Sequence, residues 1–85
     1  MNSIEWTPKA ARQLRKFTPD VQRMVYDGVG TLVHWPQTLN VKKLKNRDDY
    51  RLRIGDYRAI FTVHPDGSVT IIRIEEVKKR DEHTY

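Results

Sequence analysis

The segment Tyr50–Val63, with the sequence YRLRIGDYRAIFTV, constrains the fold more than any other part of the chain. From Tyr50 to Ile54 apolar and charged residues alternate, and the dipeptide Gly55-Asp56 follows. Alternation with a period of two is typical of a β-strand that buries one face. A two-residue loop with glycine first suits a type II′ turn between antiparallel strands. The segment therefore predicts a β-hairpin in which Ile54 pairs with Tyr57.

The register of this hairpin places Arg53 directly opposite Arg58, with Arg51 two residues along on the same face. Like charges at opposed positions of a sheet repel one another. A phosphate between the two guanidinium groups relieves the repulsion, because each group can donate charge-assisted hydrogen bonds to it. The pair therefore indicates an anion-binding site. The alternative is that these arginines pair with nearby carboxylates and only make the sheet soluble, the candidates being Asp56, Glu75 and Glu76.

Two helices are predicted before the hairpin. Thr7-Pro8 and Thr18-Pro19 each combine an N-cap residue with a proline at the first helical position. They predict helices from Pro8 to about Phe17 and from Pro19 to about Val33, and the short connection makes a helical hairpin of them. Gly28 falls on the apolar face of the second helix, where it suits close packing.

Further strands complete the predicted fold. Ile4–Trp6 and Ser68–Glu75 are candidate strands, and the lysine-rich Val41–Leu44 is a possible short extended segment. Val77–Tyr85 is predicted to be a polar tail. We therefore expect an α+β fold with the order β-α-α-β-β-β, in which the helical hairpin packs on one face of a small antiparallel sheet. By length, residues 1–85 are expected to be a single domain.

Composition limits the partners and the location of the protein. A formal net charge of +5 and a pI of about 9.7 favour an anionic partner, either a nucleic acid or an acidic protein, over a basic surface with no specific ligand. Without cysteine there is neither a disulfide nor thiolate chemistry. No apolar run approaches the roughly 18 residues of a membrane helix, and the start MNSIEW lacks the features of a signal peptide. We expect a cytoplasmic protein that does not bind membranes.

Several motifs resemble the RelE/ParE toxin superfamily. They are Lys43-Leu44, the hairpin YRLRIGDYRAIF, the strand SVTIIRI and the basic tail VKKRDEHTY. The order of the predicted elements agrees as well, so the resemblance covers nearly the whole chain. It implies a toxin of a type II toxin-antitoxin system, and a cognate antitoxin protein as its partner.

The tail favours one branch of the superfamily, because RelE-like ribonucleases and ParE-like gyrase inhibitors share the hairpin motif. Arg80-Asp81 and Tyr85 resemble the C-terminal arginine, aspartate and tyrosine of RelE-like toxins, although two extra residues separate Asp81 from Tyr85. The histidine-glycine-alanine-arginine type of ending of ParE-like proteins is absent. The resemblance therefore implies an mRNA interferase that acts with the ribosome and mRNA. A ParE-like inhibitor of DNA gyrase and a catalytically silent member that only binds antitoxin or RNA are the alternatives.

The implied reaction is a metal-independent attack of a 2′-hydroxyl on the adjacent phosphate of mRNA in the ribosomal A site. It needs a base, cations for the charge of the transition state, and an acid for the leaving oxygen. We expect the arginines to bind phosphate, the histidine to give or take a proton and the tyrosine to stack on a base; these predicted catalytic residues are Arg53, Arg58, Arg80, His83 and Tyr85. The residues predicted to bind RNA are Lys42, Lys43, Lys45, Arg51, Lys78 and Lys79.

One departure from the family concerns the base. RelE-like enzymes often carry a lysine, a candidate base, at the position of Arg53, and arginine stays protonated in proteins. We therefore expect His83, Lys43 or Lys45 to act as the base, or a weaker catalysis that rests on electrostatics. The three histidines are far apart in the sequence and lack partners in a metal-ligand pattern, so no metal or other cofactor is expected.

Overall fold

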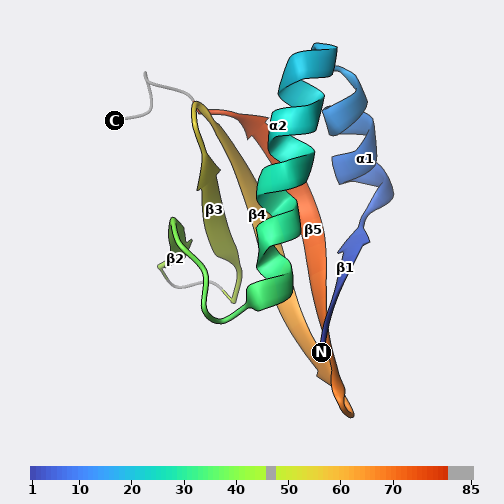
Figure 1. Cartoon of the computed structure of the whole chain (residues 1–85), viewed down its shortest axis with the longest axis vertical. Coiled ribbons are helices and arrows are strands. Elements are labelled where there is room, and N and C mark those ends of the chain that lie inside the picture. Colours follow the sequence, from blue (N-terminus) through green and yellow to red (C-terminus); the bar gives the residue numbers. More distant parts are fainter. Residues whose placement is uncertain (46–47, 81–85) are drawn as a thin grey trace.

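The computed structural model of the chain describes residues 1–45 and 48–80. The elements in chain order are β1 (Asn2–Trp6), α1 (Pro8–Arg15), α2 (Pro19–Gly30), the 3₁₀ helix η1 (Thr31–His34), β2 (Val41–Lys43), β3 (Tyr50–Ile54), β4 (Tyr57–Asp66) and β5 (Val69–Lys79). Within the described residues the five strands form one sheet in the order β1-β5-β4-β3-β2. Both helices lie over the same face of this sheet (Figure 1). The predicted α+β fold is therefore confirmed.

The sheet differs from the prediction in three details. β1 runs parallel to β5, which aligns Ile4 with Ile72 in the core, so the sheet is mostly rather than wholly antiparallel. The lysine-rich segment Val41–Lys43 is a strand of its own, β2, because it pairs with β3. β5 continues to Lys79, into residues predicted to belong to the tail, because they pair with the first residues of β4.

The helices begin where the sequence predicts and end earlier. The hydroxyl oxygen of Thr7 accepts a hydrogen bond from the N–H of Ala10 at 3.2 Å, as an N-cap does. Thr18 takes the same position before α2, but its side chain makes no capping hydrogen bond. α2 ends at Gly30, and the rest of the predicted helix is the 3₁₀ turn η1. No helix in the described part of the chain is long and apolar enough to cross a membrane.

The core fills the space between the helices and the sheet. α1 packs on β5, and α2 packs on β3 and β4. The largest fully buried side chain is Phe61 of β4, and Leu32 and Val25 cover the sheet from the helical side. Gly28 permits this approach, because a Cβ atom there would lie 2.8 Å from Cγ1 of Ile54. The close packing predicted at Gly28 is thus confirmed.

Candidate functional site

The hairpin of β3 and β4 has the predicted register. Arg53 lies directly opposite Arg58. Gly55 has a φ of +57°, and Asp56, the second residue of the turn, does not share this positive φ. That combination is typical of a type II′ turn. The turn therefore sets the register that places the two arginines opposite each other.

Arg53 and Arg58 point to the face of the sheet that the helices leave open. Their neighbours Leu52, Ile54 and Ala59 are buried in the core on the helical side, and successive side chains of a strand point to opposite faces. Arg53 is exposed and Arg58 is half-buried. The hairpin thus contributes to the core with one face and presents cations with the other.

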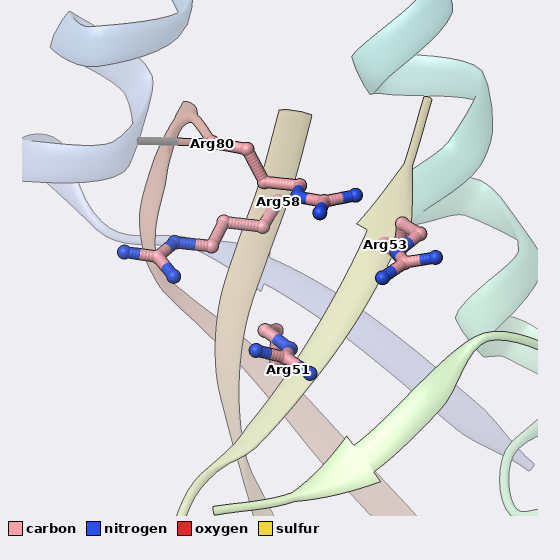
Figure 2. A pocket seen from close by; sticks show the side chains of 4 residues that line it. All are labelled: Arg51, Arg53, Arg58 and Arg80. Carbon is pink, nitrogen blue, oxygen red and sulfur yellow. The ribbon is translucent and has the colours of Figure 1, made fainter. Parts of the chain in front are cut away.

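Four arginines line a pocket of about 190 Å³ on this open face. We call it the arginine pocket; among the described residues its lining consists of Arg51, Arg53, Arg58 and Arg80. Figure 2 shows Arg51 and Arg53 on β3, while the side chain of Arg80 extends over β4. The backbone N–H of Arg80 donates a hydrogen bond to the carbonyl oxygen of Asp56 at 2.7 Å. This bond ties the start of the tail to the hairpin turn and brings Arg80 to the pocket.

The pocket lies in a row of positively charged residues on neighbouring strands. Lys78 pairs with Arg58 in register, so a line of cations crosses β3, β4 and β5. Within residues 1–45 and 48–80, Arg51, Arg53 and Arg80 make no ion pair. Because guanidinium groups match the geometry of phosphate oxygens and form bidentate hydrogen bonds with them, the pocket suits a phosphate group.

The glutamates considered as alternative partners of the arginines have other contacts. Glu75 accepts a hydrogen bond from the hydroxyl of Thr62 at 2.8 Å. A carboxylate oxygen of Glu76 lies 3.1 Å from Nζ of Lys78, and the other lies 3.9 Å from Nζ of Lys9. Among the described residues, neither glutamate forms an ion pair with Arg51, Arg53 or Arg80.

Two of the lysines predicted to bind RNA lie on the arginine-bearing face. Lys42 of β2 pairs with Arg51 of β3. Lys78 of β5 pairs with Arg58 of β4. Side chains at directly opposed positions share a face of the sheet, so both lysines lie on the face of the pocket. Lys42 extends the positive surface there, whereas the charge of Lys78 is balanced by Glu76.

The other predicted RNA-binding lysines are placed differently. Lys43 pairs with Tyr50 and Lys79 with Tyr57, and both tyrosine rings pack against the core. Lys43 and Lys79 therefore belong to the helix-bearing side of the sheet. Lys45 is exposed beyond the end of β2. The structure thus separates lysines that the sequence groups together.

Two predicted catalytic residues, His83 and Tyr85, lie outside the described residues, as does Asp81. In the described part of the chain, no three metal-ligating side chains are grouped so that they could hold a metal ion.

Sequence reasoning missed two backbone contacts that shape the site. One is the bond from Arg80 to the carbonyl of Asp56. The other is the bond from the N–H of Arg53 to the carbonyl oxygen of Asn40, at 2.9 Å. Asn40 has a φ of +63°, and asparagine is one of the few residues that tolerate this conformation. Because backbone contacts join distant segments whatever their side chains are, residue patterns give little sign of them.

Comparison with known proteins places this geometry in a family. A sequence model of the "ParE toxin of type II toxin-antitoxin system, parDE" matches residues 4–80. No curated protein matches the chain in a sequence search.

Solved structures with the same fold include three bacterial and archaeal toxins. The toxin-antitoxin complex RelBE2 from Mycobacterium tuberculosis has 22% identity and a TM-score of 0.75, with 92% of this chain and 96% of that chain covered. The YoeB/ParE toxin from Agrobacterium tumefaciens has 15% identity and a TM-score of 0.74, with coverages of 93% and 99%. The archaeal RelE–RelB complex from Pyrococcus horikoshii has 24% identity and a TM-score of 0.71, with coverages of 95% and 97%.

The family match spans nearly all of the chain, and the similar structures share the arrangement of two helices on a mostly antiparallel sheet. The resemblance seen in the hairpin motif is thereby confirmed. The chain belongs to the ParE toxin family within the RelE/ParE superfamily, and it is a toxin of a type II toxin-antitoxin system.

Proposed function

We propose that the protein is an endoribonuclease that cleaves mRNA in the ribosomal A site and so inhibits translation. The arginine pocket is the observation that carries the proposal, because it gathers four cations on an open face of the sheet. Phosphodiester cleavage increases the negative charge on the phosphate oxygens, and preorganised cations stabilise that charge. The resemblance to RelE-like toxins supports RNA as the substrate.

In the proposed reaction the phosphate to be cleaved binds between Arg53 and Arg58. The adjacent 2′-hydroxyl loses its proton and its oxygen bonds to phosphorus, while the bond from phosphorus to the 5′-oxygen of the next nucleotide breaks. A proton then reaches that 5′-oxygen, which leaves a cyclic phosphate on one product and a 5′-hydroxyl on the other. Arg80 supplies a further cation for the charge that develops in the transition state.

The residue that takes the proton from the 2′-hydroxyl is proposed from the sequence and from the position of Lys43 on β2. Lys43 lies on the helix-bearing side of the sheet, away from the opposed arginines, and this position disfavours it as the base. We propose His83 for this role, with Lys45 as the alternative. Tyr85 is proposed to stack on a base of the mRNA, which is a common way for proteins to hold unpaired RNA.

A second candidate function is inhibition of DNA gyrase. The observation in its favour is the family model that matches residues 4–80, which is described as a ParE toxin. In that case the positive face of the sheet binds an acidic surface of another protein or DNA, and no phosphodiester is cut. A catalytically silent member that only binds its antitoxin or RNA is the third possibility.

We further propose that a cognate antitoxin binds this toxin and masks its positive face. Two of the similar structures are complexes of a toxin with its antitoxin, which supports such a partner. Action on ribosomes places the protein in the cytoplasm in this proposal.

Expression in bacteria, followed by three measurements, separates these functions. New protein synthesis, mRNA ends and plasmid supercoiling are compared for the wild type and for variants Arg58→Ala and Arg80→Ala. Arg23→Ala is the matched control, because Arg23 is an exposed arginine of α2. Circular dichroism of the purified variants checks that each one folds.

The proposal predicts translation arrest with discrete mRNA cuts for the wild type and for Arg23→Ala, and neither effect for the two pocket variants. Loss of supercoiling without mRNA cuts would favour the gyrase inhibitor. A wild type that changes none of the three quantities points to the silent member. Full toxicity of both pocket variants would show that the arginine pocket does not bind the phosphate.

A further inference from the structure

A second positively charged pocket adjoins the arginine pocket. It has a volume of about 200 Å³, and its lining in the described residues consists of Asn40, Val41, Lys42, Arg51 and Arg53. Arg51 and Arg53 line both pockets. The two pockets are therefore contiguous and meet at β3. We call the second one the Lys42 pocket.

The Lys42 pocket repeats the charge arrangement of the first. Lys42 and Arg51 are directly opposed on β2 and β3, as Arg53 and Arg58 are on β3 and β4. Lys42 is exposed and makes no ion pair within residues 1–45 and 48–80. Opposed cations repel one another, and an anion held between them removes the repulsion. A phosphate between Lys42 and Arg51 therefore relieves their repulsion as one between Arg53 and Arg58 does.

The backbone holds the two pockets at a fixed separation. The carbonyl oxygen of Asn40 accepts the N–H of Arg53 at 2.9 Å, and this bond places the start of β2 against β3. Neighbouring strands of a sheet lie about 4.8 Å apart. One pair of cations bridges β2 and β3 at Arg51, and the other bridges β3 and β4 at Arg53, two residues further along the strand. Since a strand also rises about 3.4 Å per residue, the two sites lie roughly 8 Å apart. Consecutive phosphates of one nucleic-acid strand can span such a short separation.

We propose that the open face of the sheet is a track for two consecutive phosphates of a single-stranded RNA. The arginine pocket takes the phosphate to be cleaved, and the Lys42 pocket takes its neighbour. Arg51 and Arg53 contact both phosphates, so the RNA crosses the strands from β4 toward β2. The identity of the first phosphate as the cleaved one rests on the proposed function. Lys43 has no part in the track, because it belongs to the other face.

Binding of short RNAs of defined length tests the track. The probes are a fluorescently labelled dinucleotide with one phosphodiester and a trinucleotide with two, both without terminal phosphates. Their 2′-O-methyl groups leave no hydroxyl to attack. At low ionic strength the wild type is expected to bind the trinucleotide roughly tenfold more tightly, the effect of one charge-assisted hydrogen bond.

Two lysine variants make the test specific. Lys42→Ala is expected to remove most of the gain from the second phosphodiester. It should also lower the slope of log affinity against log salt by about one for the trinucleotide. Lys43→Ala removes the same charge from the neighbouring position of β2. This variant is expected to keep the higher affinity for the trinucleotide. Equal affinity of the wild type for both probes, or an equal loss in both variants, would overturn the track.

These outcomes are distinct from failure of the proposed ribonuclease. If cells show discrete mRNA cuts but the second phosphodiester adds no affinity, the track is wrong and the ribonuclease stands. If the affinity gain depends on Lys42 but no mRNA is cut, the track stands and the cleavage is wrong.

Discussion

Arg53 and Arg58 face each other at directly opposed positions of β3 and β4, on the face of the sheet that the helices leave open. Opposed like charges destabilise a sheet, and the turn at Gly55 holds them in this position. Departures from a local rule are expected at functional sites, where another requirement outweighs stability. The pair therefore connects the stability of the hairpin to its proposed binding of phosphate.

The first prediction is that removing one of the opposed charges stabilises the fold. Arg53→Thr is expected to raise the free energy of unfolding by about 0.5 kcal/mol at low salt, because it ends the repulsion and places a good strand former in β3. Salt screens charges at exposed positions, so the gain should shrink as sodium chloride is added. Urea unfolding at low and high salt measures it. A loss of stability at both salt concentrations would contradict the repulsion.

The second prediction concerns stabilisation by a simple anion. Inorganic phosphate should raise the Tm of the wild type, because a ligand that binds only the folded state stabilises it. Arg58→Ala should show a clearly smaller rise, since the variant lacks one side of the arginine pocket. Sodium chloride at matched ionic strength is the control for screening. Equal phosphate-dependent shifts in the wild type and the variant would show that the anion binds elsewhere.

The third prediction uses two glycines of α2. A Cβ atom at Gly28 would lie within 2.9 Å of three side-chain atoms of Ile54, whereas one at Gly30 would have no neighbour within 4 Å. Gly28→Ala should therefore lower the free energy of unfolding by about 1–3 kcal/mol through overpacking. Gly30→Ala should leave it unchanged or raise it by up to about 1 kcal/mol. Urea unfolding of both variants decides the matter, and equal effects would refute the close contact of α2 with β3.

The fourth prediction concerns the part of β5 that follows the end of its pairing with β1. The pairing of β1 with β5 ends at Ile74, and the N–H of the buried Val77 donates to Oε1 of Gln13 on α1 at 2.8 Å. Gln13→Ala leaves this donor without its acceptor and should cost about 1–3 kcal/mol. Gln13→Glu keeps an acceptor oxygen and should cost less. Unfolding free energies, with hydrogen exchange of the Val77 amide, measure both. Equal losses would mean that the bond contributes little to stability.

The hairpin and its opposed arginines could be predicted from the sequence for a physical reason. A two-residue turn allows only one register, so locating Gly55-Asp56 also determined which residue faces Arg53. The N-termini of the helices were predictable in the same way, since Thr7-Pro8 and Thr18-Pro19 are local signals. The position of Arg80 in the pocket is expected only from the resemblance to RelE-like toxins. The backbone bond that brings it there joins residues 56 and 80, and no local pattern encodes it.

The positions of the lysines on the two faces of the sheet could not be predicted from the sequence. The sequence predicts one role for Lys42 and Lys43 because they are adjacent and basic, but adjacent residues of a strand point to opposite faces. From the sequence, Val41–Leu44 is predicted only as a possible extended segment, because it is short and rich in lysine. In the structure three of its residues form β2. The predicted strand ends at Glu75, because the last residues of β5, Glu76–Lys79, are mostly charged and lack a continuous apolar pattern. Pairing with β4 outweighs this weak local preference.

Mapping of mRNA ends on translating ribosomes tests the central claim most directly. Purified wild-type protein, Arg58→Ala and the control Arg23→Ala are each added to a reconstituted translation reaction, and primer extension locates new mRNA ends. We predict discrete ends in the A site for the wild type and for Arg23→Ala, and none for a folded Arg58→Ala. The claim is contradicted if the wild type produces no new ends, or if Arg58→Ala produces them as efficiently.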